Sequence, residues 1–87
     1  MDEIEIELTP QERDLILNNP FAGTDLTKRL QLLEIRGNQL IAKYDIEELN
    51  ELLGVIAADA IHTWDENLKK RLDKLFEKLS RVLEKYK

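Results

Sequence analysis

The chain contains no cysteine, a single histidine, two prolines and three glycines. The absence of cysteine excludes disulfides, thiol nucleophiles and thiolate metal sites. No apolar run approaches the roughly 20 residues that a membrane-spanning helix needs, and the acidic start Met1-Asp2-Glu3 differs from the basic start of a signal peptide. We therefore expect a cytoplasmic protein that does not enter a membrane.

Aromatic residues make up only 6% of the chain, whereas 43% of its residues are hydrophobic and 36% are charged. This balance is typical of one folded domain, here 1–87, whose single core supplies roughly 3–5 kcal/mol of net stability. The charges are unevenly distributed, because residues 1–66 hold fifteen acids and five bases while residues 67–87 hold three acids and eight bases. The two segments should attract each other, and the acidic majority of the chain disfavours nucleic acid.

The first residues predict a strand followed by a capped helix. Apolar residues at 4, 6 and 8 alternate with glutamates, which is the period of an edge strand with one wet face. Thr9-Pro10-Gln11-Glu12 then combines a threonine N-cap, a proline at the first helical position and a glutamate three residues after the cap. A helix should therefore begin at Pro10 and end before Pro20, because the residue preceding a proline is displaced from the helical region.

Leucines at helical spacing predict a second helix from Thr24 or Asp25 to Arg36, with Gly37 able to adopt the left-handed conformation of a C-cap. Leu40, Ala42 and Tyr44 then alternate with Ile41, Lys43 and Asp45, and this period of two predicts a second strand. Two short helices between the strands return the chain in the opposite direction. We therefore expect an antiparallel ribbon in which Lys43 lies across from a glutamate of the first strand.

Two longer helices are expected to complete the chain. Asp45-Ile46-Glu47-Glu48 repeats the capping pattern at the start of a helix, in which Gly54 and the nearby alanines allow close packing of a neighbouring helix. The residues over 62–65 are mediocre helix formers and indicate a hinge. An apolar seam follows in 67–87, at alternating steps of four and three residues. The seam consists of Leu68, Leu72, Leu75, Leu79, Val82 and Tyr86, widened by Phe76 and Leu83.

These elements predict an α+β, mainly α fold of order β-α-α-β-α-α, with a two-stranded antiparallel ribbon and a C-terminal antiparallel helical hairpin. The hairpin places the basic end of its second helix beside the acidic start of its first. A single helix over 46–86 is the alternative, because no glycine or proline follows Gly54, and it would oblige the chain to dimerise. The charges matched in the hairpin are Arg81, Lys85 and Lys87 with Glu47, Glu48 and Glu51.

The one constellation with possible metal chemistry surrounds His62. In an unbroken helix, Asp59, His62 and Glu66 share a face and offer two carboxylates and an imidazole. The predicted hinge separates them, so we prefer to interpret His62 as a surface or hinge-packing residue. Trp64 beside the same hinge is expected to close the end of the hairpin core, with stacking on a ligand as the alternative, and it is also a candidate residue of an interaction surface.

A basic stripe runs along the last predicted helix. Its functional interpretation is contact with phosphate or with an acidic partner, and its structural interpretation, which we favour, is a solvated face balanced by the acidic helix before it. No aromatic residues are interleaved for base stacking, so nucleic-acid binding is not expected. The stripe comprises Lys70, Lys74, Lys78, Arg81 and Lys85.

Two segments carry a resemblance to other proteins. Leu8-Thr9-Pro10-Gln11-Glu12-Arg13 and Ala57-Ala58-Asp59-Ala60-Ile61-His62-Thr63, with Asp73 and leucines at 68, 72 and 75, resemble a loose group of small uncharacterised prokaryotic domains. Those domains occur alone or attached to larger plasmid-type proteins. The resemblance spans most of the chain and implies a helical accessory or regulatory domain with no catalytic residues to transfer.

The sequence offers no arrangement for catalysis. No serine or threonine has a histidine placed to activate it, and no glycine-rich phosphate loop is present. We therefore expect a non-enzymatic protein without cofactor or small-molecule substrate, which works as a protein-protein interaction module or self-associates as a homodimer. The alternative function is a nucleic-acid-associated regulator that uses the basic helix, and the third is a metal-dependent site at His62.

Overall fold

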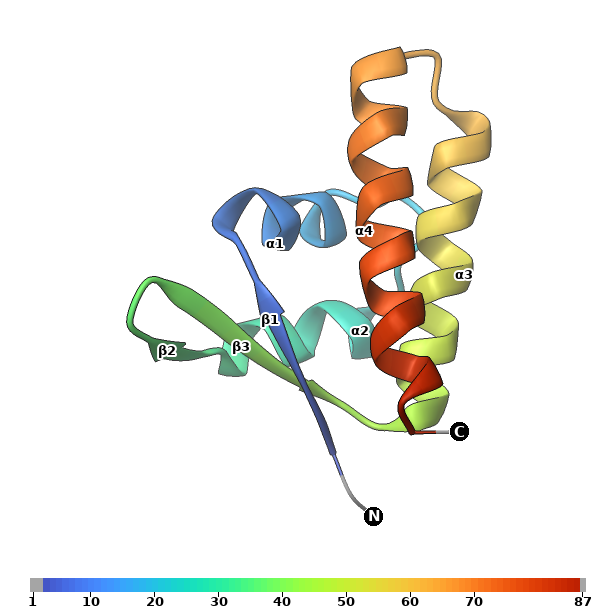
Figure 1. The fold of residues 1–87 in the computed structure, drawn as a ribbon. Coiled ribbons are helices and arrows are strands. Elements are labelled where there is room, and N and C mark those ends of the chain that lie inside the picture. The colour runs from blue at the N-terminus through green and yellow to red at the C-terminus, as the bar shows by residue number, and fades with distance from the viewer. Residues whose placement is uncertain (1–2, 87) are drawn as a thin grey trace.

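The computed structural model describes residues 3–86, and its fold confirms the predicted α+β class (Figure 1). A small antiparallel sheet lies beside an upright hairpin of two long helices. The sheet has three strands, so the predicted two-stranded ribbon is wrong in this respect. In chain order the elements are β1 (Ile4–Leu8), α1 (Pro10–Leu17), α2 (Thr24–Lys28), the 3-10 helix η1 (Arg29–Leu32), β2 (Glu34–Arg36), β3 (Gln39–Tyr44), α3 (Ile46–His62) and α4 (Glu66–Glu84).

The sheet has the order β1-β3-β2, and both neighbouring pairs are antiparallel. β1 is an edge strand and Glu5 lies opposite Lys43 in the register, as the sequence predicted. On the same polar face, Nη2 of Arg36 in β2 reaches across β3 to Oε2 of Glu5 at 2.9 Å and also lies 3.0 Å from Oε2 of Glu34. Ile41 of β3 is buried on this polar face, because long side chains of both edge strands surround it.

The predicted helix over 24–36 is much shorter than expected, and the end of that segment is a strand. α2 has five residues, η1 follows, and the chain then becomes extended to form β2. Gly37-Asn38 is a two-residue loop that joins β2 to β3, and Gly37 has a φ of 61°. Glycine at the first position of such a loop is typical of a type II′ hairpin turn. Strand pairing with β3 therefore outweighs the helical spacing of the leucines.

Capping boxes start α1 and α3, as predicted. At α1, Oγ1 of Thr9 accepts a hydrogen bond from the amide of Glu12 at 3.1 Å, and Oε1 of Glu12 accepts one from the amide of Thr9 at 2.9 Å. At α3, Oδ1 of Asp45 accepts from the amide of Glu48 at 2.7 Å, and Oε1 of Glu48 accepts from the amide of Asp45 at 3.1 Å. Each box satisfies two backbone N–H groups and so determines where its helix begins.

α3 and α4 form the predicted helical hairpin, and the alternative of one helix over 46–86 is wrong (Figure 1). A loop of three residues, 63–65, separates the two helices. Asp65 caps α4, because its Oδ1 accepts hydrogen bonds from the amides of Asn67 at 2.9 Å and Leu68 at 3.2 Å. The side chain of Asp65 thus satisfies the first amides of α4 and fixes the turn between the helices.

The buried seam of α4 follows the geometry of a straight helix. Val82 is only half-buried and Tyr86 is exposed, although the repeat puts both on the apolar seam. Alternating steps of four and three residues average 3.5 residues per turn, whereas an α-helix has 3.6, so the seam shifts by the last turns. Leu83, which was expected only to widen the seam, is therefore buried, whereas Val82 is half-buried. The buried residues of α4 are Leu72, Leu75, Leu79 and Leu83.

Two buried polar side chains tie the irregular segments to the core. Nδ2 of Asn19 donates to the carbonyl of Val55 in α3 at 2.9 Å, and Oδ1 of Asn19 accepts from the amide of Phe21 at 2.8 Å. The hydroxyl of Tyr44 donates to the carbonyl of Leu26 at 3.0 Å. These hydrogen bonds attach the loop after α1 to α3, and attach α2 to β3.

Alanine substitutions at Gly37 and Gly54 are expected to change stability in opposite directions. At a φ of 61°, an L side chain at position 37 costs roughly 1–2 kcal/mol. Gly54 lies inside α3, where an added Cβ meets no atom within 4 Å, so Gly54→Ala should gain roughly 0.5–1 kcal/mol of helix stability. This open space also shows that the predicted role of Gly54 in close helix packing is wrong. Urea unfolding measures the change in the free energy of unfolding for each variant. If both variants were stabilised, or both destabilised, the explanation by backbone conformation would be contradicted.

Candidate functional site

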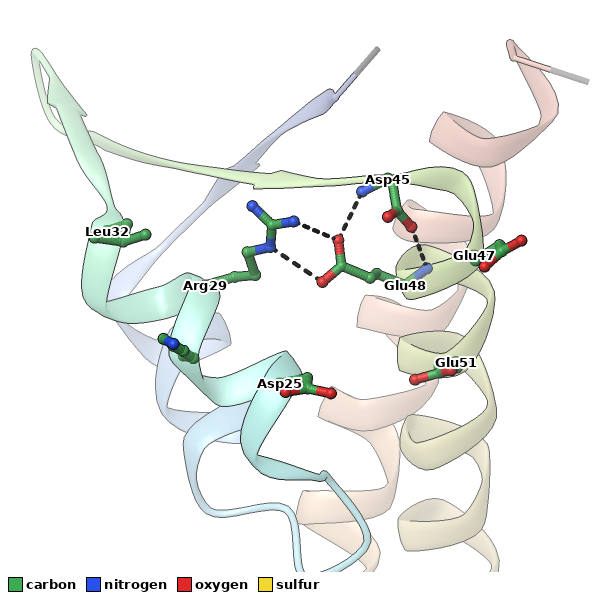
Figure 2. Close-up of a pocket in the computed structure, with 8 residues that line it drawn as sticks. Asp25, Arg29, Leu32, Asp45, Glu47, Glu48 and Glu51 are labelled. Carbon is green, nitrogen blue, oxygen red and sulfur yellow. Dashed lines mark hydrogen bonds and ion pairs between the residues drawn. The ribbon is translucent and has the colours of Figure 1, made fainter. Parts of the chain in front are cut away.

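A pocket of about 450 Å³ opens beside the start of α3 (Figure 2). α2 and η1 lie on one side of it and the first turns of α3 on the other. Acidic side chains predominate around it, and those of Asp25, Glu47 and Glu51 are exposed. The lining residues are Asp25, Lys28, Arg29, Leu32, Asp45, Glu47, Glu48 and Glu51.

An ion pair between Arg29 and Glu48 crosses this pocket (Figure 2). Nε of Arg29 donates to Oε2 of Glu48 at 3.0 Å and Nη2 donates to Oε1 at 2.9 Å, which is the bidentate geometry of a strong arginine-carboxylate pair. Nη1 of Arg29 donates to Oε2 of Glu3 at 2.6 Å. The hydrogen bond with Glu48 raises the pKa of Arg29 above its ordinary value. Because Glu48 also accepts the amide of Asp45, both side chains are engaged, and the pair clamps η1 to α3.

The predicted charge match along the hairpin is wrong in its partners. Glu48 pairs with Arg29, and Arg81 pairs with Glu77 within α4, where Nη2 and Oε1 lie 3.0 Å apart. Within residues 3–86, no ion pair joins α3 to α4. Lys87 lies outside the described residues. The negative charge at the start of α3 is therefore compensated by Arg29 of η1, which is in direct contact with Glu48.

The basic stripe of α4 is partly engaged by acids of the same chain. Nζ of Lys78 lies 2.8 Å from Oε1 of Glu12, so this acidic neighbour comes from α1 rather than from α3 as predicted. Arg81 is held by its own helix, as described above. These contacts favour the structural interpretation of the stripe over a phosphate site. The exposed members of the stripe are Lys70, Lys74, Arg81 and Lys85.

The candidate metal ligands Asp59, His62 and Glu66 do not form a cluster. α3 ends at His62 and Glu66 begins α4 beyond the loop, so the helical register that would align the three is broken. The imidazole of His62 lies against the ring of Phe21, with centroids 5.4 Å apart and planes tilted by 33°. Asp59 lines a separate pocket of about 360 Å³ together with Arg71. Across residues 3–86, no three His, Cys, Asp or Glu side chains gather as metal ligands.

Trp64 is 100% exposed, so the prediction that it closes the hairpin core is wrong. Thr63 and Asp65 on either side of Trp64 have extended backbone, and successive side chains of an extended chain point to opposite sides. Thr63 is half-buried, whereas Trp64 points away into solvent. Ile61 on the last turn of α3 is 76% exposed, and Phe76 of α4 is 37% exposed. Sequence reasoning did not select Ile61, although its apolar side chain lies outside the buried seam of α3.

An apolar groove of about 210 Å³ lies between α3 and α4 near this end of the hairpin. It is lined by alanines of α3, by the larger Ile61 and Phe76, and by one cation and one anion from α4. We refer to this groove, together with Trp64, as the hairpin-end surface. The residues lining the groove are Ala57, Ala60, Ile61, Lys69, Asp73 and Phe76.

Comparison of the chain with protein-family models, with curated proteins and with solved structures found no match. The resemblance to small prokaryotic domains therefore stays a prediction. Among residues 3–86, no helix is both long enough and apolar enough to cross a membrane.

Proposed function

We propose that this chain is a non-enzymatic protein-contact module and that its partner binds the hairpin-end surface. The observation that carries the proposal is the position of Trp64, the single tryptophan, which is fully exposed at the loop between α3 and α4. An indole in water leaves a large apolar area unburied, which a partner surface can cover. Tryptophan is also among the residues that contribute most to binding energy at protein interfaces.

The surroundings of Trp64 support the same function. Single exposed apolar side chains are ordinary, but several at one site indicate a contact surface. Ile61 lies three residues before Trp64 and is 76% exposed, and the groove that it lines extends to Phe76 of α4. An aromatic side chain three residues after the groove residue Ile61, together with an apolar groove that has charges at its edge, matches the usual composition of an interface core and rim.

The acidic pocket supports a contact function less directly. Its central side chains, Arg29 and Glu48, are bound to each other and to the backbone of Asp45. A general acid or base has to be free to reach a substrate, whereas the hydrogen bonds of Arg29 and Glu48 are made to each other and to the chain itself. The pocket therefore supports a structural role at the start of α3, and the hairpin-end surface is the better candidate for function.

A photo-crosslinking amino acid at position 64 is expected to capture the partner in the cells that make this protein. The photoreactive side chain replaces Trp64, and irradiation should yield a covalent adduct of defined mass, identified by peptide sequencing. The same residue placed at Lys74, which is exposed on the basic stripe of α4, is the matched control. A partner of the hairpin-end surface should be crosslinked from position 64 and far less from position 74.

The same experiment tests the basic stripe as the contact site. Adducts obtained from position 74 and not from position 64 would contradict the proposed function and favour the stripe. The partner captured from position 64 should, once purified, bind the wild-type chain and lose most of its affinity for Trp64→Ala, because removal of an interface tryptophan typically costs about 2 kcal/mol or more. Equal binding of Trp64→Ala and wild type would also contradict the proposal.

A further inference from the structure

The hairpin-end surface carries charges that complement each other. Lys69 and Asp73 lie four residues apart on one side of α4, and both line the apolar groove. Within residues 3–86, the ion pairs involve neither of them. Lys70 and Lys74 lie roughly 100° and 140° further round the helix from Lys69, since each residue advances about 100°. The charges of α4 that line the groove are therefore one cation and one anion, with Glu66 about 60° round the helix from Lys69.

We infer that the partner of the hairpin-end surface is a second copy of this chain, related by a two-fold axis, an inference that rests on the proposed function. A two-fold interface joins the same patch of two molecules, so a charge that becomes covered is stabilised when the patch itself supplies an opposite charge across the axis. Lys69 and Asp73 meet this condition. When the two α4 helices run antiparallel, Lys69 of each copy lies opposite the partner's Asp73.

The same register covers the exposed apolar residues. The axis passes midway between Lys69 and Asp73, at the level of Arg71. Phe76 lies five residues beyond this level and therefore comes opposite position 66 of the partner, roughly 7.5 Å from the axis. That position is the exposed Glu66, two residues after the partner's Trp64. The large side chain of Trp64 then lies close enough along the axis to cover Phe76 of the other copy, and the alanines of α3 that line the groove leave room for its approach.

The charge pattern favours a second copy over a partner of strongly charged surface. A site for an acidic or a basic partner would carry charges of one sign around its groove. This groove instead holds one charge of each sign, spaced by one helical turn. Like charges at the basic stripe do not oppose the pairing, because Lys74 lies well round the helix from the groove side of α4.

Charge reversal at the two positions tests the arrangement. Lys69→Glu and Asp73→Lys should each weaken self-association by about tenfold or more, because each variant places like charges opposite each other at two symmetric points. Sedimentation velocity over a concentration series measures this change. The fluorescence of Trp64 provides a second readout, since burial of the indole in the dimer should shift its emission to shorter wavelength as concentration rises.

Mixing the two variants gives the sharpest result. In an equimolar mixture, the glutamate introduced at position 69 of one variant should face the lysine introduced at position 73 of the other, and the unchanged Asp73 should face the unchanged Lys69. The mixture should therefore form a heterodimer at concentrations where each variant alone is monomeric, and the double reversal in one chain should restore the homodimer. Lys74→Glu changes the net charge by the same amount as Lys69→Glu and should leave association nearly unchanged.

The outcomes separate this inference from the proposed function. A wild-type chain that sediments as a monomer at high micromolar concentration, with no shift of Trp64 emission, overturns the second copy as partner. If crosslinking from position 64 still captures a different protein, the contact module itself stands. A dimer that resists both single reversals, or a mixture that does not associate, also overturns the two-fold register. Circular dichroism confirms that each variant is folded, as expected for exposed positions.

Discussion

Replacement of Leu79 by alanine is expected to lower the free energy of unfolding by about 3 kcal/mol. Leu79 is fully buried in α4, in the cluster that unites the sheet, α1 and both long helices. Truncation removes its apolar contacts and leaves a cavity that close-packed neighbours fill only in part. A small domain of this kind has a total stability of roughly 5 kcal/mol, so the loss is a large fraction of it. The melting temperature should fall by about 12 °C or more.

Leu32→Ala is the matched control for this prediction, because it removes the same atoms from a side chain in a residue that is 75% exposed. The control should change the stability by no more than about 0.5 kcal/mol. Thermal and urea unfolding of both variants, followed by circular dichroism, measure the difference. Equal stability of the two variants would mean that α4 does not contribute Leu79 to the core.

Local signals were sufficient to predict where most elements begin. The caps at Thr9 and Asp45 each depend on residues only three positions apart, so the sequence contains the whole interaction. The alternation over 4–8 and 40–44 predicted the pairing of β1 with β3 and the position of Lys43, because a buried face specifies the register of a strand. The helical hairpin was predicted from the apolar seams of its two helices and from the weak helix formers over 62–65 between them.

The segment over 24–36 shows where local signals fail. Its leucines fit a helix, yet the last part pairs with β3 as a strand, because a free sheet edge supplies hydrogen bonds that a short helix cannot match. The dipeptide Gly37-Asn38 between Ile35 and Leu40 was the available sign of a hairpin, since it separates two apolar stretches by two residues. The helix prediction used Gly37 only as a C-cap.

The candidate site was less predictable than the fold, because it depends on contacts between distant residues. Arg29 and Glu48 are 19 residues apart, and their pairing follows from the way η1 packs beside α3. The exposure of Trp64 depends on the path of a three-residue loop, in which Thr63 and Asp65 have extended backbone. A hydrophobicity pattern contains neither the path of a loop nor the distance between helices.

The buried phenol of Tyr44 should lower the stability of the fold at high pH. Its side chain is fully buried, and its hydroxyl donates to the carbonyl of Leu26 at 3.0 Å. Burial is the main cause that raises the pKa of Tyr44 above its ordinary value of 10.0, the carboxylate of Glu48 raises it further, and the guanidinium of Arg29 opposes the rise. The unfolded chain therefore ionises this phenol near pH 10, whereas the folded chain keeps it neutral to higher pH.

We expect the stability contributed by Tyr44 to be complete below about pH 10 and to fall by about 1.4 kcal/mol per pH unit above it, because there the unfolded chain binds fewer protons. Tyr44→Phe should lose about 1 kcal/mol near pH 7, where the hydrogen bond to Leu26 is missing, but should lack this slope. Urea unfolding of both proteins between about pH 7 and 11 measures the difference, in which the contributions of all groups that the two proteins share cancel. Parallel curves above pH 10 would mean that Tyr44 ionises within the folded protein, against the effect of its burial.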